Sequence, residues 1–90
     1  MIDVRYADTF LKDLSALKST PYYKKIKSIC FDELPQCVNV THIRNLKKME
    51  GYKDFFRIRV GDYRIGLLIQ GNSVDVLRVL NRKDIYKYFP

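Results

Sequence analysis

The stretch from residue 56 to residue 64, FRIRVGDYR, alternates apolar and cationic side chains around a Gly-Asp dipeptide. Because side chains alternate across a strand, Arg57 and Arg59 are expected to point to one face of a sheet and their apolar neighbours to the other. A two-residue type II′ turn at Gly61-Asp62, which needs glycine first, pairs Arg59 with Arg64. Like charges that face each other on paired strands repel. The pattern therefore predicts a guanidinium cluster whose planar, bidentate donors suit an anion such as a phosphate group.

Positive charge dominates the composition and is unevenly distributed. The chain carries 17 Lys and Arg against 10 Asp and Glu, which gives a formal net charge of +7. Such a balance indicates a polyanion or an acidic protein as partner. Most arginines lie after residue 52, whereas most lysines lie before it. Since arginine binds phosphate through a fixed fork and lysine is a flexible point charge, we interpret the late arginines as a site and the early lysines mainly as solubilising and steering charge.

The remaining composition predicts neither a metal site nor a membrane segment. Cys30 and Cys37 lack CxxC spacing, and one histidine is too few for a zinc site, so we interpret both thiols as buried or idle. The N-terminus lacks the cationic start and apolar run of a signal peptide, and no segment approaches the roughly 18 apolar residues of a membrane span. We therefore expect a cytoplasmic protein without a cofactor, folded as a single domain over residues 1–90.

The first half of the sequence predicts a strand followed by a helical hairpin. The first six residues alternate apolar and polar side chains, as in a strand with one buried face. Asp8 or Thr9 is expected to cap a first helix whose apolar positions recur at helical spacing. Thr20-Pro21 repeats the start signal for a second helix, which Pro35 is expected to end.

The second half of the sequence predicts an antiparallel meander. Residues 36–51 fit a loop or a short strand equally well. Together the elements predict an α+β fold in which the helical hairpin covers one face of a largely antiparallel sheet and the arginines occupy the other. Gly66, opposite Arg57, marks either a hollow for a backbone phosphate or a plain bend. The expected elements are strands at residues 55–60, 63–69 and 74–80 and a helical turn at residues 81–88.

The string R-x-R-x-G-D-Y-R, with Val79, Arg82 and Tyr86 downstream, resembles the RelE/ParE superfamily of toxins from bacterial and archaeal toxin–antitoxin systems. The resemblance spans nearly the whole chain and implies the same order of elements and an antitoxin protein as partner. It also implies one of two activities, because the RelE-like branch cuts mRNA in the ribosomal A site without a metal and the ParE-like branch targets DNA gyrase. A set of basic residues and a tyrosine is typical of the RelE-like branch, which the resemblance therefore favours. The matching positions in this sequence are Arg57, Arg59, Arg64, Arg82 and Tyr86.

Metal-free cleavage of RNA needs a base for the ribose 2′-hydroxyl, cations for the charge on the phosphorane and an acid for the leaving 5′-oxygen. Arginine stays protonated and is a poor base. Tyr86 is the candidate base, because nearby cations favour its phenolate and Arg82 lies four residues earlier on the same face of a helical turn. Tyr86 also fits a stacking platform for a nucleobase or a core aromatic. Many relatives have histidine where Asn81 precedes Arg82, which narrows the choice of proton acceptor. Glu50 and His42 are the other candidate bases, although His42 is more typical of a surface residue.

Other basic residues are expected to contact RNA as less specific positive charge. The face to which Arg78 points depends on the register set by the loop at residues 70–73, since a slip of one residue reverses every side chain. The candidate RNA contacts are Lys47, Lys48, Arg78 and Lys83.

Two functions of different kinds follow from the resemblance and the arginine pattern. The first is a ribosome-dependent mRNA endonuclease, the toxin of a type II toxin–antitoxin system, which an antitoxin neutralises. The second is a binding module without catalysis, either a gyrase inhibitor of the ParE kind or an inactive homologue that represses its operon together with its antitoxin. The full arginine set favours the first.

Overall fold

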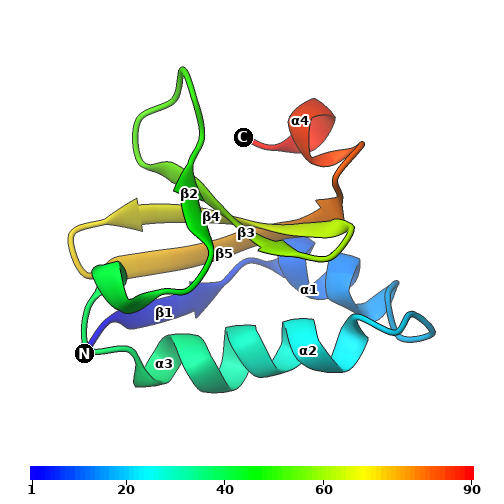
Figure 1. Cartoon of the computed structure of the whole chain (residues 1–90), viewed down its shortest axis with the longest axis horizontal. Coiled ribbons are helices and arrows are strands. Elements are labelled where there is room, and N and C mark those ends of the chain that lie inside the picture. The colour runs from blue at the N-terminus through cyan, green and yellow to red at the C-terminus, as the bar shows by residue number, and fades with distance from the viewer.

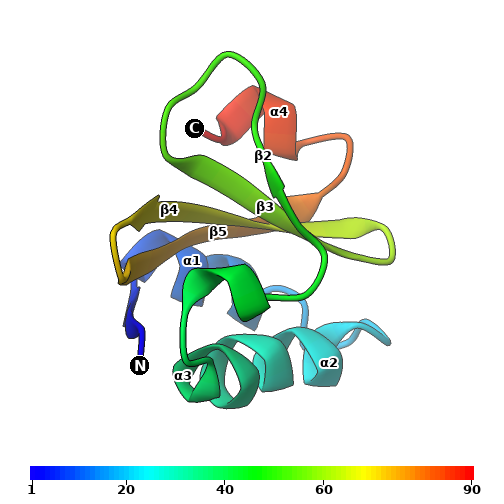
Figure 2. The same ribbon diagram turned by 60° about the vertical axis from the view of Figure 1, so that its left-hand side comes forward.

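The computed structural model describes all 90 residues as a five-stranded sheet with helices on one face and a short helix and a long loop on the other (Figures 1 and 2). The strands are β1 (Asp3–Tyr6), β2 (Leu46–Lys48), β3 (Phe55–Val60), β4 (Tyr63–Gln70) and β5 (Ser73–Asn81). The α-helices are α1 (Asp8–Ser15), α2 (Tyr23–Ser28), α3 (Leu34–Gln36) and α4 (Ile85–Tyr88), with a π-helical turn η1 (Ile29–Glu33) and a 3-10 turn η2 (Val40–His42).

The sheet has the strand order β1-β5-β4-β3-β2, in which β1 runs parallel to β5 and the other pairs are antiparallel. This arrangement confirms the predicted α+β fold and its meander. It also decides between the two readings of residues 36–51, because a short strand, β2, pairs with β3 inside that stretch.

The predicted hairpin register is confirmed. Arg59 faces Arg64 across the β3–β4 pair, and Arg57 faces Gly66. Gly61 has a φ of 56°, whereas Asp62 is not among the residues with positive φ, as a type II′ turn requires. The local turn signal was therefore sufficient to place the three arginines on one face.

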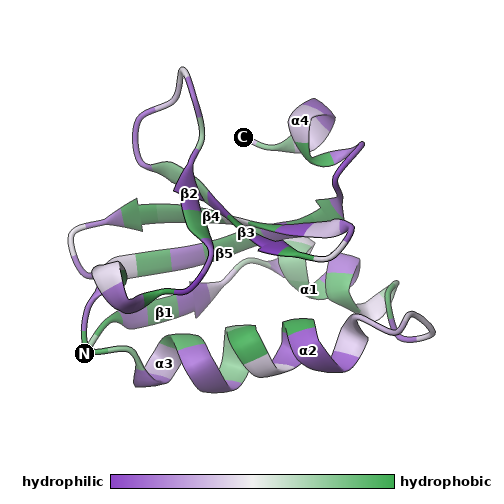
Figure 3. Cartoon of the chain, viewed as in Figure 1, coloured by the Kyte–Doolittle hydropathy of each residue, from purple (hydrophilic) through white to green (hydrophobic).

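The main core lies between the sheet and helices α1 to α3. Ile58, Ile65 and Val79 point into it from the strands, and Phe10 and Ile26 meet them from the helices, all of them at most 1% exposed. Figure 3 shows the alternation of hydrophobic and hydrophilic residues along the strands that separates this face from the other. Burying side chains of this size contributes roughly 1.5–3 kcal/mol each, so this layer holds the sheet on which the arginines stand.

A second, smaller cluster covers part of the opposite face. Met49, Ile85 and Phe89 are buried there, so that α4 packs on the sheet through Ile85 and Phe89. The ring of Phe89 lies over Gly66, where an added Cβ would come within 2.8 Å of a ring carbon. One of the two interpretations of Gly66 was a hollow for a backbone phosphate, and this interpretation is wrong because an aromatic ring fills the space. The register shift between Gly66 and Leu67 agrees with the other reading, a bend.

The second helix passes the position at which Pro35 was expected to end it. In the π-helical turn the Leu34 N–H donates to the Ile29 carbonyl, five residues back. The next donor in this pattern would be Pro35, which has no N–H, so the Cys30 carbonyl lacks its helical partner. The Tyr6 hydroxyl donates to that carbonyl instead. A side chain from β1 thereby lets the helix continue to its end in α3.

The predicted helix caps were wrong. Thr20 does not cap the second helix, because its hydroxyl donates to the Leu17 carbonyl and α2 begins only at Tyr23. The first helix begins at Asp8 without a side-chain cap, and the Thr9 hydroxyl donates to a carbonyl of β5. The Thr9 hydroxyl thus has a tertiary partner, whereas the Thr20 hydroxyl bonds to the preceding turn of the chain.

None of the helices combines the length and the apolar character needed to cross a membrane.

Candidate functional site

A hollow lies on the sheet face opposite helices α1 to α3, between the β2–β3 loop and α4. In both ribbon views the loop and α4 rise from the same side of the sheet (Figures 1 and 2), and in Figure 1 the C-terminus lies between them. The hollow has a volume of about 460 Å³. Its lining residues are Lys47, Lys48, Met49, Glu50, Tyr52, Arg57, Tyr86 and Phe89.

Arg64 is held at the edge of this region by the main chain. The Nη1 group of its half-buried guanidinium donates to two carbonyls, that of Gly61 at 2.8 Å and that of Tyr63 at 3.0 Å. Carbonyl groups orient a guanidinium without neutralising it. The fork is therefore fixed in direction while its other N–H groups have no protein acceptor.

The arginines lie within electrostatic range of one another. Burial lowers the pKa of the Arg64 guanidinium below its usual value, and the charges of Arg57 and Arg59 lower it further. Arg82 adds to the lowering, whereas Tyr86 opposes it. None of these arginines forms a salt bridge. The structure thus brings together all five residues that the sequence analysis assigned to the catalytic site, with no acidic partner to balance them.

The β3–β4 turn ties the C-terminal segment to Arg64. The Arg82 N–H donates to the Asp62 carbonyl at 2.7 Å, so the same turn that accepts from Arg64 also anchors Arg82. Arg82 precedes α4 instead of lying within it, which corrects the expected i, i+4 placement on one helical turn. Tyr86 is 64% exposed, which excludes the reading of this residue as a core aromatic, because Phe89 occupies that position. The roles of base and of stacking platform both stay open.

The other candidate residues divide between the hollow and places outside it. Lys47, Lys48 and Glu50 line the hollow. Lys83 is exposed in the turn before α4 and is not part of the lining. His42 lines a different groove, of about 540 Å³, next to α3. Glu50 therefore remains a candidate base, and His42 does not lie with the arginines.

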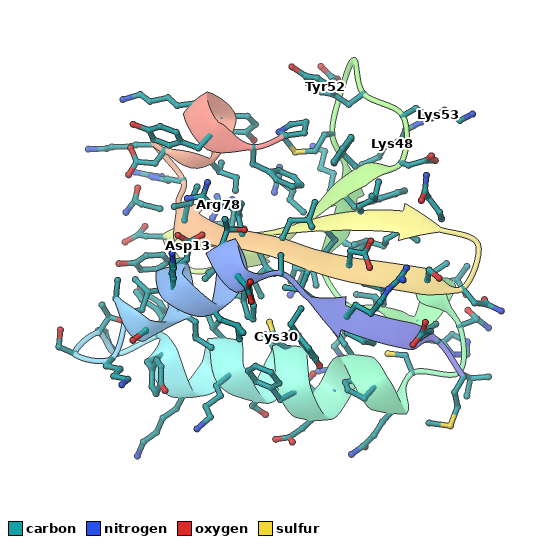
Figure 4. The ribbon with its side chains drawn as sticks, turned by 180° about the vertical axis from the view of Figure 1, so that it is seen from behind. Asp13, Cys30, Lys48, Tyr52, Lys53 and Arg78 are labelled. Atoms are coloured by element: carbon teal, nitrogen blue, oxygen red, sulfur yellow. The ribbon has the colours of Figure 1, made fainter.

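Arg78 does not join the cluster, in contrast to its expected role as an RNA contact. Its Nε donates to Asp13 Oδ2 at 2.7 Å and its Nη2 to Asp13 Oδ1 at 3.1 Å, and Figure 4 shows the two side chains together. The same carboxylate accepts from the Val79 N–H at 3.2 Å. The hydrogen bonds that the guanidinium donates to Asp13 raise the pKa of Arg78. This bidentate pair fastens α1 to β5 and occupies the guanidinium.

The sequence analysis missed Tyr52. This side chain is 51% exposed on the β2–β3 loop and forms part of the lining of the hollow (Figure 4). The centroid of its ring lies 6.4 Å from that of Phe55, with an angle of 84° between the ring planes. The Phe55 and Phe89 ring centroids are in turn 5.5 Å apart, with an angle of 81° between the planes. The sequence feature that could have indicated this residue is an aromatic between Gly51 and Lys53, in a polar stretch shortly before the arginine strand.

The thiols and carboxylates do not form a metal-binding group. No three His, Cys, Asp or Glu side chains lie close enough together to hold a metal ion. Cys30 is buried, which raises the pKa of its thiol to about 12. Cys37 is partly buried and forms no disulfide, and its thiol donates to the Glu33 carbonyl at 3.4 Å.

Known proteins resemble the chain along almost its full length. The family model of the ParE toxin of type II toxin–antitoxin systems matches residues 4–86. A protein named toxin RelE3 from Methanocaldococcus jannaschii is 43% identical over 93 residues, which cover 97% of this chain and 98% of that protein. The RelB–RelE antitoxin–toxin complex from Methanococcus jannaschii contains a chain with 41% identity and a TM-score of 0.75, covering 96% of this chain and 99% of that chain. The Escherichia coli DinJ–YafQ complex, at 13% identity and a TM-score of 0.71 over the whole of both chains, shares the fold.

Proposed function

The chain belongs to the RelE/ParE superfamily of toxins of type II toxin–antitoxin systems, and we propose that it inhibits translation as an endonuclease that cuts mRNA on the ribosome. The observation that carries the proposal is the group of arginines around Arg64 that lacks any acidic partner. Uncompensated, partly buried guanidinium groups favour an anion, and a phosphodiester with its developing phosphorane charge is such an anion.

Arg57, Arg59 and Arg64 are the proposed clamp on the scissile phosphate. The attack of the ribose 2′-oxygen on phosphorus forms a phosphorane whose non-bridging oxygens carry the added negative charge. Donors that are already oriented stabilise this charge more than they stabilise the substrate, and each such donor contributes on the order of 3 kcal/mol. Arg64 meets this requirement best, because two carbonyls fix its guanidinium before the substrate arrives.

Tyr86 and Arg82 complete the proposed chemistry. Tyr86 acts as the general base that takes the proton of the 2′-hydroxyl as the bond from O2′ to phosphorus forms. The bond from phosphorus to O5′ then breaks, and the departing oxygen, steadied by Arg82, takes up a proton from solvent water to become a 5′-hydroxyl. The other product ends in a 2′,3′-cyclic phosphate. The side chains of Tyr86 and Arg82 are both exposed and lie within electrostatic range of Arg64, so both can act on a phosphate bound there.

Three further parts of the proposal concern partners and location. An antitoxin is the proposed protein partner, since the RelB–RelE structure is an antitoxin–toxin complex. The ribosome and its bound mRNA are the proposed target, which places the activity in the cytoplasm. Lys47, Lys48 and Lys83 supply exposed positive charge for unspecific contacts with RNA.

The alternative function is inhibition of DNA gyrase, and the observation in its favour is the match to a family model named after ParE. The two functions make different demands on Tyr86. A protein inhibitor needs a surface and has no use for a proton acceptor beside the arginines, whereas the nuclease needs both.

An in vitro translation assay with primer extension on the mRNA tests the proposal. The wild type is expected to produce cuts within codons, and Tyr86→Phe is expected to reduce the cutting rate by about 10²- to 10⁴-fold, the usual contribution of a general base. Tyr88→Phe is the matched control, because Tyr88 is 61% exposed on the same helix but does not line the hollow. Intact mRNA with the wild-type protein, together with inhibition of purified gyrase, would establish the alternative.

A further inference from the structure

We propose that the outer part of the hollow is a nucleobase subsite, in which Tyr52 stacks on the base and the Glu50 carboxylate accepts hydrogen bonds from the amino group of that base. This inference rests on the proposed function, because it supplies the base-binding part of the same RNA site. The subsite selects cytosine, adenine or guanine over uracil at one position of the substrate.

The charge of Glu50 is the first step. It is the one carboxylate among the residues that line the hollow, and it forms no salt bridge with the lysines and arginine around it. A free carboxylate repels a phosphate group and therefore weakens a site that binds only phosphate. It is compatible with a nucleotide if it faces the uncharged part of the ligand, which is the base.

The aromatic row is the second step. Tyr52 lies at the exposed end of the row that continues through Phe55 to Phe89, with near-perpendicular rings. Phe89 is 3% exposed, so the row is rooted in the smaller core cluster. The ring of Tyr52 is thereby oriented in advance but half of its surface remains free. Stacking of a base on such a ring changes affinity by roughly 5- to 150-fold.

The loop itself is closed by main-chain hydrogen bonds. The Met49 N–H donates to the Phe55 carbonyl at 2.8 Å, and the Ile69 N–H donates to the Asp54 carbonyl at 2.9 Å. Gly51, with a φ of 80°, allows the chain to turn between these ends. The loop therefore holds the carboxylate and the aromatic ring on the same hollow as Arg57, one of the three arginines of the proposed phosphate clamp.

The preference among bases follows from the donors and acceptors. An ionised carboxylate only accepts hydrogen bonds. Cytosine, adenine and guanine each present an amino group on the edges that proteins read in single-stranded RNA, whereas uracil has no amino group and its one N–H donor on these edges, at N3, is flanked by two carbonyl oxygens. A carboxylate thus attracts the first three bases and repels the carbonyls of the fourth.

Titration of the full chain with single nucleotides, followed by the backbone amide NMR signals, tests the subsite without any cleavage. The probes are the four ribonucleoside 5′-monophosphates and ribose 5-phosphate. Cytidine, adenosine and guanosine monophosphate are expected to shift the signals of both the β2–β3 loop and the arginine strand, whereas ribose 5-phosphate shifts only the arginine strand. Glu50→Gln is expected to lower about tenfold the ratio by which the chain binds the other three nucleotides more tightly than uridine monophosphate. Tyr52→Ala is expected to lower the affinity for all four nucleotides by a similar factor.

Matched controls make the result specific to this loop. Glu33→Gln makes the same chemical change at an exposed carboxylate beside the groove near α3, and Tyr88→Ala removes an equally exposed ring outside the hollow. Both controls are expected to bind the nucleotides as the wild type does. Identical shifts with ribose 5-phosphate and with the nucleotides, or equal affinity of the wild type for all four bases, would overturn the subsite.

The two levels of the proposal fail separately. If the wild type leaves mRNA intact but discriminates among the mononucleotides, the subsite stands and the endonuclease does not. If the wild type cuts mRNA with the same choice of base as Glu50→Gln and Tyr52→Ala do, the endonuclease stands and the subsite does not.

Discussion

The contact between Gly66 and Phe89 allows the position of α4 to be perturbed from the sheet beneath it. An alanine at residue 66 would place its Cβ 2.8–2.9 Å from three carbons of the Phe89 ring, closer than side-chain carbons approach one another. The ring cannot swing aside freely, because it is buried and packs edge-on against Phe55. Gly66→Ala is therefore expected to push Phe89, and with it α4, away from the sheet.

The expected loss of activity is larger than the expected loss of stability. Overpacking of this kind costs roughly 1–3 kcal/mol, which is a part of the roughly 5–15 kcal/mol that keeps a domain folded. The main core on the other face of the sheet does not contain Phe89 and remains intact. Displacement of α4 separates Tyr86 from the arginines, and loss of the proposed general base is expected to lower the rate by about 10²- to 10⁴-fold. The variant should be folded and almost inactive.

Urea unfolding and primer extension on the same preparations measure the two effects. Gly66→Ala combined with Phe89→Leu, which makes room for the methyl group, is expected to recover part of the stability lost by the glycine variant, with a coupling free energy of about 1 kcal/mol or more between the two sites. If Gly66→Ala were as stable and as active as the wild type, the close contact would not position α4 and the reasoning would be wrong.

Three other perturbations address charge and burial. Arg64→Ala should retain the fold while its mRNA cleavage falls by about 10²- to 10³-fold, since the removed donor is oriented toward the transition state; a rate near that of the wild type in primer extension would exclude Arg64 from the clamp. Asp13→Asn should lower the free energy of unfolding in urea by about 2 kcal/mol, because it weakens a partly buried charged hydrogen bond, whereas Asp75→Asn, which breaks the exposed pair with Arg5, should cost less than about 1 kcal/mol; equal losses would contradict the structural role of Asp13. Burial raises the pKa of Cys30 to about 12, above its value in the unfolded chain, so this thiol stabilises the fold fully below the unfolded pKa and the free energy of unfolding should fall as the pH rises from about 9 toward 12, a slope that Cys30→Ala should reduce.

The hairpin at the centre of the site was predictable because its signals are local. The Gly-Asp pair determines the turn type, the turn determines the register, and the register determines which arginines share a face. Every step involves residues within ten positions of one another, which is why Arg57, Arg59 and Arg64 lie where the sequence placed them. The apolar segments of the meander were likewise sufficient to predict the fold class.

The parts that failed depend on contacts between distant residues. Arg78 was assigned to RNA on charge alone, but its partner Asp13 lies 65 positions earlier on α1. Gly66 carries no local sign that a ring 23 residues later fills the space above it. The Thr9 hydroxyl, a candidate helix cap, donates instead to the Leu77 carbonyl on β5, 68 positions later. Sequence patterns thus predicted which side chains share a face of the sheet. Contacts between distant residues determined which groups pack on each face.

The hydrogen-bond acceptors of the arginines differ between the one that supports the fold and the one in the proposed site. Arg78 is neutralised by a carboxylate that grips it with both oxygens, as is usual where a guanidinium supports the fold. Arg64 is held by two main-chain carbonyls, which fix its direction but leave its charge uncompensated. A carboxylate in the same place would orient Arg64 equally well, yet it would compete with a phosphate for the same donors. Because interactions with a charge strengthen as water is excluded, orienting the arginines through carbonyls, and α4 through the rings of the smaller cluster, preserves the positive potential that the proposed reaction needs.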